Sequence, residues 1–255
     1  IRKTYPQTYW FSEEHVSHHF LMQLDENCDR VAEFHNVAMD LPGMKKAEQA
    51  FTAFTLRELQ SVRTISLDGI DIAVPSVRFN AVYVFIHAWH HFSGNGVGVR
   101  QLADWMLCLH ELAQTLSAEE KQAYAHDLER LLRRMSMLQI WQTFGCVIVR
   151  HLGLPKEEFL LYNASQERRG ERLYRQLLHD GHGYRLANKE KGATIHSFPF
   201  HRPEKNRIAQ VLFTLVRIPY DTFQLAKIFP HLAIRQFFGK IRLGVLKVLK
   251  KTASV

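Results

Sequence analysis

The chain has 255 residues, of which 46% are hydrophobic and 23% charged, a balance that excludes global disorder and allows a sizeable buried core. Its 33 lysines and arginines exceed its 25 acidic residues, so the formal net charge of +8 favours polyanionic or phosphorylated partners without naming one. Three widely spaced cysteines form no CxxC pair, which argues against a zinc site or a disulfide framework and favours a reducing cytoplasm.

The N-terminal third shows the two-residue periodicity of strands. It predicts a hairpin with strands over 19–24 and 30–37, and because alternate residues share a strand face, Glu33 and His35 point the same way. A helix is expected over 44–64. A second hairpin follows over 64–74, with Asp68-Gly69 as its tight turn.

Two helices joined by a glycine-rich turn come next. Ser76 is a candidate N-cap for the first, whose apolar stretch 81–86 predicts the central pillar of the core. His87 and His91 have the spacing of a metal site on a helix, but a structural role, with hydrogen bonds from the imidazoles to backbone or acidic groups, is the favoured interpretation. In the second helix, Arg100 and Asp104 lie one turn apart and can pair along one helix face. A buried bridge from them to another element is the favoured expectation, and a functional contact is the alternative.

The remainder of the chain is predicted to be helical. Helices are expected over 117–135, 137–152, 166–179, 203–216, 221–228 and 230–251, with breaks at Pro219 and Pro230 and a polar loop over 180–197. The predicted fold class is α+β, with a small N-terminal sheet in a region spanning 1–75 and a larger helical domain spanning 76–255.

The last predicted helix is basic and amphipathic. It could contact an anionic membrane surface, but its broad apolar stripe favours packing on the domain. Its aromatic residues are not interleaved with the basic ones, so we expect no specific nucleic-acid partner. No apolar run is long enough to span a bilayer, and the first residues lack the apolar core of a signal peptide.

A resemblance to a known family adds to these expectations. The run from His87 and His91 through Gly96 to Arg100 and Asp104, followed by a tryptophan, resembles the signature of the uncharacterised nucleotidyltransferase family, a bacterial branch of the polymerase-beta-like superfamily. Residues 33–35, Glu-Phe-His, are similar to the E-x-H of the strand that carries this family's third acidic residue.

The resemblance implies a remnant of the nucleotidyltransferase fold, with a nucleoside triphosphate as substrate, an unknown acceptor and Mg²⁺ as cofactor. Glu33 would be a catalytic residue and the third metal-site carboxylate. His35 would orient it or contact phosphate. The helices from Ser76 onward would buttress the site.

The sequence departs from the family upstream of this strand. No Gly-Ser followed by a D-x-D pair precedes Glu33, and Asp68 and Asp71 come after it with the wrong spacing. Because residue 1 is isoleucine, the favoured explanation is that an N-terminal part lies upstream. The alternative is a catalytically inactive binding or scaffold protein that keeps the fold and uses its basic surface for an anionic partner.

Overall fold

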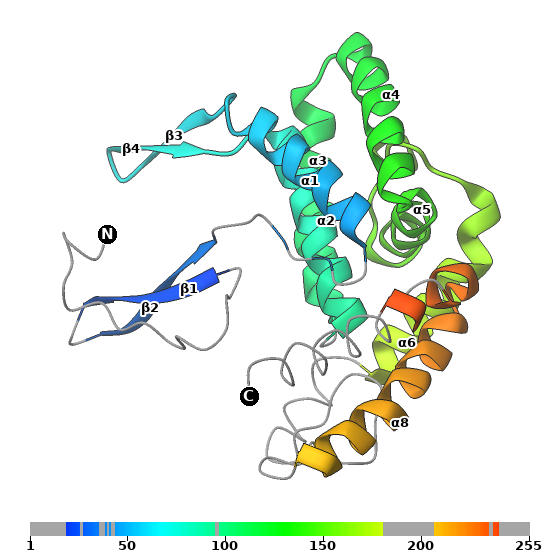
Figure 1. The fold of residues 1–255 in the computed structure, drawn as a ribbon. Helices are drawn as coiled ribbons and strands as arrows, with labels where there is room; N and C mark the ends of the chain where they lie inside the picture. Colours follow the sequence, from blue (N-terminus) through cyan, green and yellow to red (C-terminus); the bar gives the residue numbers. More distant parts are fainter. Residues whose placement is uncertain are drawn as a thin grey trace.

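The computed structural model of the chain describes residues 19–25, 28–35, 39, 41, 44–94, 97–180, 207–234 and 237–239. Two antiparallel hairpins in the N-terminal third, with one helix between them, are followed by a larger set of packed helices, so the predicted α+β class is confirmed (Figure 1). The same core unites residues 39–54 with the helices after residue 76. The proposed domain boundary at 75/76 stays a prediction.

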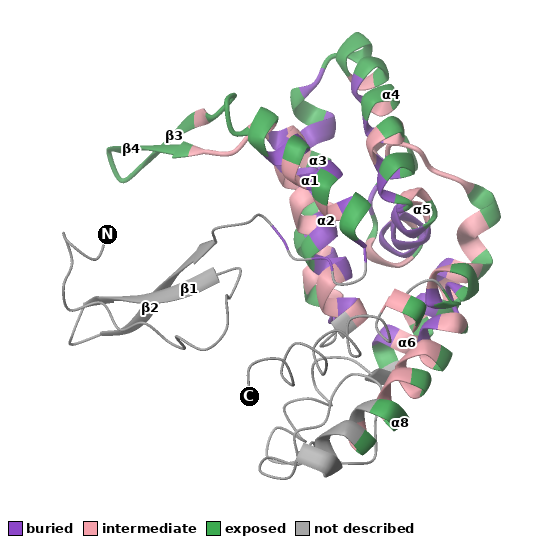
Figure 2. Ribbon diagram, viewed as in Figure 1, coloured by how far each residue is buried: buried purple, intermediate pink, exposed green. Residues whose placement is uncertain are grey.

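Both predicted hairpins are present. Strands β1 (His19–Asp25) and β2 (Cys28–His35) pair antiparallel, and so do β3 (Arg63–Leu67) and β4 (Ile70–Val74). The second hairpin turns at Asp68 and Gly69, whose φ angles of 51° and 78° match the tight turn expected from the sequence. It projects from the helices with most of its residues exposed (Figure 2).

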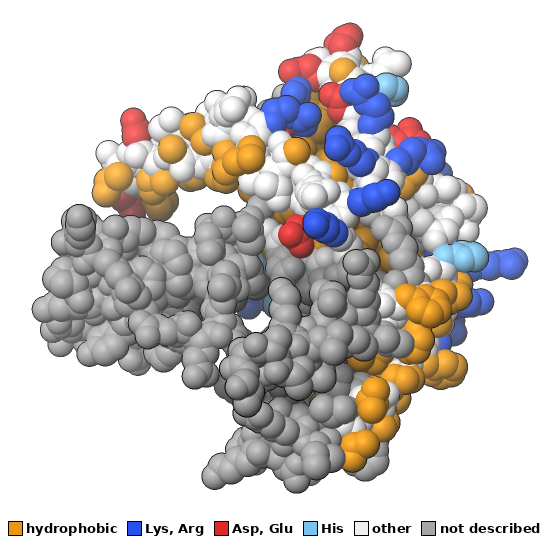
Figure 3. Space-filling view, viewed as in Figure 1, with side chains coloured by type: hydrophobic (Ala, Val, Ile, Leu, Met, Phe, Trp, Pro, Cys, Tyr) orange, Lys and Arg blue, Asp and Glu red, His pale blue; other side chains and the backbone are white. Residues whose placement is uncertain are grey.

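One face of the β3–β4 hairpin is apolar. Ile65 pairs with Ile72, and Leu67 pairs with Ile70, which places these four residues on one face of the pleat. Their exposed fractions range from 38% to 66%. Hydrophobic side chains are accordingly visible over this hairpin, and also along the α8 helix (Figure 3).

The helix α2 (Val77–Gly94) is the central pillar that the sequence predicts. Ala81, Val82, Phe85 and Ile86 are fully buried, because α1 (Lys45–Glu58), α3 (Val99–Thr115) and α5 (Leu138–Val147) supply the surrounding core. The indole N–H of Trp105 on α3 donates to the Ala81 carbonyl over 2.8 Å. This buried hydrogen bond joins α2 to α3.

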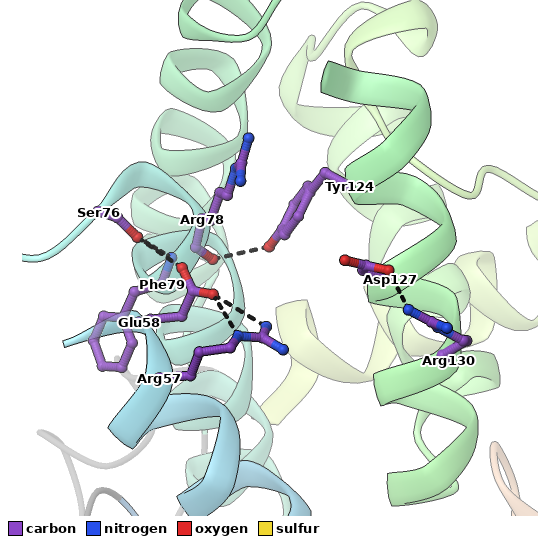
Figure 4. A network of polar contacts seen from close by, with 8 residues as sticks. All are labelled: Arg57, Glu58, Ser76, Arg78, Phe79, Tyr124, Asp127 and Arg130. Carbon is purple, nitrogen blue, oxygen red and sulfur yellow. Dashed lines mark hydrogen bonds and ion pairs between the residues drawn. The ribbon is translucent and has the colours of Figure 1, made fainter. Parts of the chain in front are cut away.

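Polar contacts close the end of this bundle. Ser76 caps α2, since its Oγ accepts from Phe79 N over 3.0 Å and donates to a Glu58 carboxylate oxygen over 3.1 Å (Figure 4). The Tyr124 hydroxyl on α4 (Ala118–Met135) donates to the Arg78 carbonyl over 2.9 Å, and burial raises the pKa of this phenol. The contacts link the end of α1, the start of α2 and α4.

A capping box begins α4: the Ser117 hydroxyl accepts from Glu120 N, and the Glu120 carboxylate accepts from Ser117 N. After α5 the chain continues as a π-helical turn (Ile148–Leu152) and two short 3-10 turns (Lys156–Glu158 and Ala164–Gln166). The helix α6 (Glu167–Asp180) then packs on α5.

The sequence prediction is wrong at Pro219. Instead of two helices separated there, α8 (Arg207–Ala226) continues through this proline. Proline has no N–H, so the Leu215 carbonyl loses its helical partner. Both residues are exposed, and water can bind that carbonyl instead, which explains why the helix is not broken.

Two predicted segments lie largely outside the residues that the structure describes. The polar loop over 180–197 lies outside the described residues except for Asp180, and so does most of the amphipathic helix expected over 230–251. Membrane contact through that helix stays a prediction. In the part of the chain that the structure describes, every helix is too short or too polar to cross a bilayer.

Candidate functional site

Glu33 and His35 lie on β2, as the sequence predicts. Glu33 is opposite Leu21 and His35 is opposite His19 in the antiparallel register. Being two residues apart, they belong to one face of the hairpin. Their side chains lie outside the described part of the structure, so their assigned roles rest on strand register and sequence.

The histidines at the end of α2 come together. The Nε2 atoms of His87 and His91 are 2.8 Å apart, a hydrogen-bond distance, and their ring centroids are 4.6 Å apart. Such a bond requires an N–H on one ring and a lone pair on the other, so at least one imidazole is neutral. Tyr83 lies one turn earlier, with its ring centroid 6.1 Å from that of His87.

Potential metal ligands do not gather beyond this pair. Across the described ranges, no group of three or more His, Cys, Asp and Glu side chains is placed to hold a metal ion. No such group therefore forms around the His87–His91 pair within these ranges.

The expectation of a buried bridge from Arg100 and Asp104 to another element is wrong, because both side chains are exposed on α3. The inward face of α3 is occupied by apolar side chains, namely Leu102, Trp105, Leu109 and Leu112. Arg100 and Asp104 lie off that face and point to solvent. The buried polar group that joins α3 to α2 is instead the Trp105 indole, a role that sequence reasoning did not assign.

Sequence reasoning also missed a group of charged side chains between the π-helical turn and α6. Arg150 comes from the turn, while Arg168, Arg172 and Arg175 come from α6, and all four line one surface cavity. A signal was present in residues 167–175, ERRGERLYR, where arginines recur at helical spacing.

Comparison with known proteins assigns none of these features. No protein-family model, no curated protein and no solved structure matches the chain.

Proposed function

We propose that this chain supplies part of a nucleotidyltransferase, which transfers a nucleoside monophosphate from a nucleoside triphosphate to an acceptor. The observation that carries the proposal is the placement of Glu33 and His35 on one face of β2, within an antiparallel hairpin. This is the strand on which the resemblance places its third acidic residue.

The chemistry of nucleotidyl transfer explains why a carboxylate is needed there. Carboxylates hold Mg²⁺, which neutralises the triphosphate and orients it for in-line displacement. In the proposal Glu33 contributes one such oxygen ligand, and His35 orients that carboxylate or donates a hydrogen bond to phosphate. The Gly-Ser and D-x-D elements of the superfamily are not among these 255 residues.

The helical body provides the second part of the proposal. The motif residues His87 and His91 lie near the end of α2, and Trp105 joins α3 to this helix through the Ala81 carbonyl. The Trp105 hydrogen bond thus joins α3 to the helix that carries both histidines. The proposed role of the helices is to buttress the site and to help bind nucleotide or acceptor.

The proposal is tested by calorimetric titration of the chain with each of the four ribonucleoside triphosphates, with and without Mg²⁺. We expect Mg²⁺-dependent binding that is lost in Glu33→Gln and retained in Glu129→Gln, a matched change on α4. Equal binding by both variants would contradict the role of Glu33.

The second candidate is a catalytically inactive binding protein for an anionic partner, as the net charge of +8 and the arginine-lined cavity favour. The same titration separates the two candidates. Binding of triphosphates that is indifferent to both Mg²⁺ and Glu33→Gln would favour the binding protein.

A further inference from the structure

A surface cavity of about 410 Å³ lies between the π-helical turn that follows α5 and the first turns of α6. Six side chains line it, all of them charged: Arg150, Glu167, Arg168, Glu171, Arg172 and Arg175. Its volume is in the range of small-molecule sites. π-helical turns are rare and occur frequently at functional sites.

The two carboxylates of the cavity already have partners. Glu167 accepts a hydrogen bond from the Tyr162 hydroxyl over 2.7 Å and forms an ion pair with Arg150 at 2.5 Å. These contacts hold the pKa of the Glu167 carboxyl below its usual value, with the Tyr162 hydrogen bond as the largest cause. Glu167 is therefore a charged part of the wall at neutral pH.

Glu171 is held in the same way. Its carboxylate contacts Arg175 Nε and His151 Nε2, each at 3.0 Å, and the hydrogen bond from Arg175 is the main cause of its lowered pKa. The His151 ring in turn stacks on Tyr174, with centroids 3.8 Å apart and planes 7° apart. The carboxylates thus bind Arg150 and Arg175 and fix them in the wall.

Arg168 and Arg172 differ from the other two arginines. They lie one helical turn apart on α6, both are exposed, and within the described ranges neither forms an ion pair with a carboxylate. Four arginines against two glutamates leave two positive charges uncompensated at the cavity. The pKa of neighbouring Arg169 is lowered mainly by burial and, to a smaller extent, by repulsion from Arg172.

We propose that this cavity binds the phosphate groups of a small phosphorylated molecule, with Arg168 and Arg172 as the residues that hold them. Guanidinium groups present planar pairs of N–H donors that match phosphate oxygens, and they keep their charge at any physiological pH. The six lining side chains include no aromatic ring on which the bases of a nucleic-acid strand could stack. The lining of the cavity therefore favours a small phosphorylated molecule over a nucleic-acid strand.

Calorimetric titration with inorganic pyrophosphate at low ionic strength tests this site. EDTA in the buffer excludes the Mg²⁺-dependent site proposed around Glu33, so failure of one proposal does not affect the other. We expect Arg168→Gln/Arg172→Gln to weaken pyrophosphate binding by about tenfold or more. The matched control Arg130→Gln/Arg134→Gln on α4 removes two charges at the same spacing outside the cavity, and should change binding by less than about twofold.

A further double variant distinguishes loss of the binding site from loss of the fold. Arg168→Lys/Arg172→Lys keeps both charges but removes the paired donors, and we expect intermediate affinity. Absence of pyrophosphate binding by the unmodified chain, or equal weakening by the α6 and α4 glutamine pairs, would overturn the proposal. So would binding of a single-stranded oligonucleotide that depends on Arg168 and Arg172 but that pyrophosphate does not displace.

Discussion

Replacement of Gly145 by alanine tests how tightly α5 is packed. An added Cβ would clash with the tip of the Phe159 ring and overlap its Cζ and both Cε atoms. The ring has little freedom to move, because it stacks on Trp141 with centroids 5.7 Å apart and meets Trp105 edge-on at 5.8 Å. Glycine at this position is therefore required by the close approach of an aromatic ring.

The magnitude follows from two opposing effects. Overpacking a well-packed core costs about 1–3 kcal/mol, and the severe overlap places this case near the upper end. Alanine in place of glycine within a helix recovers about 0.5–1 kcal/mol. We therefore expect Gly145→Ala to lower the free energy of unfolding by about 2 kcal/mol.

Urea unfolding followed by far-ultraviolet circular dichroism measures this difference. The matched experiment introduces Gly145→Ala into a Phe159→Ala background, where the overlapping ring is absent. There the alanine should be neutral or should stabilise by up to about 1 kcal/mol, through helix propensity alone. Equal destabilisation in both backgrounds would refute the steric explanation, as would stabilisation of the unmodified chain.

Three further substitutions test individual polar contacts. Ser76→Ala removes the cap of α2 and its hydrogen bond to Glu58, and should lower the unfolding free energy in urea by about 1 kcal/mol. Tyr124→Phe removes the hydrogen bond to the Arg78 carbonyl and should cost a similar amount, about 1 kcal/mol, in the same assay, whereas no loss would show that water replaces it. Tyr162→Phe should raise the pKa of the Glu167 carboxyl toward its ordinary 4.5, as followed by NMR titration. Because the pKa of the Glu167 carboxyl is lowered in the folded state, this hydrogen bond stabilises the fold above the unfolded-state pKa, and that stabilisation is lost as the pH falls through the folded-state pKa. An unchanged pKa of Glu167 in Tyr162→Phe would contradict the assigned cause.

Local signals in the sequence were sufficient for much of the fold. The alternation along both hairpins, the Asp68-Gly69 turn and the caps at Ser76 and Ser117 each depend on residues within a few positions of one another. The burial of Ala81, Val82, Phe85 and Ile86 followed from the apolar stretch on α2, although Tyr83 and Val84 within it are only half-buried.

Other features depend on the environment of each residue, which the local pattern does not contain. Pro219 does not end α8, because its exposed position lets water bind the carbonyl left without a helical partner. Leu178 is apolar but 59% exposed on α6, since Leu173 and Leu177 occupy the buried face. The spacing of Arg100 and Asp104 places them on one face of α3 but does not say whether that face is buried or exposed. The contact of Trp105 with α2 decides this, because it turns the opposite face of α3 toward the core.

The candidate site was only partly accessible from sequence. The pairing of His87 with His91 follows from helical spacing and is observed at 2.8 Å. The arginine-lined cavity was missed because Arg150 and Arg168 are far apart in the chain and meet only when α6 packs on α5. Long-range packing, and not local propensity, creates that surface.

The central claim is that Glu33 binds the metal of a nucleotide complex. Electron paramagnetic resonance of Mn²⁺, which can replace Mg²⁺ at oxygen ligands, measures this directly in the presence of a non-hydrolysable nucleoside triphosphate. We predict that the chain increases the bound fraction of Mn²⁺ and that Glu33→Gln abolishes the increase, while Glu129→Gln leaves it unchanged. An increase that persists in Glu33→Gln, or no increase with the unmodified chain, would contradict the proposed role of Glu33.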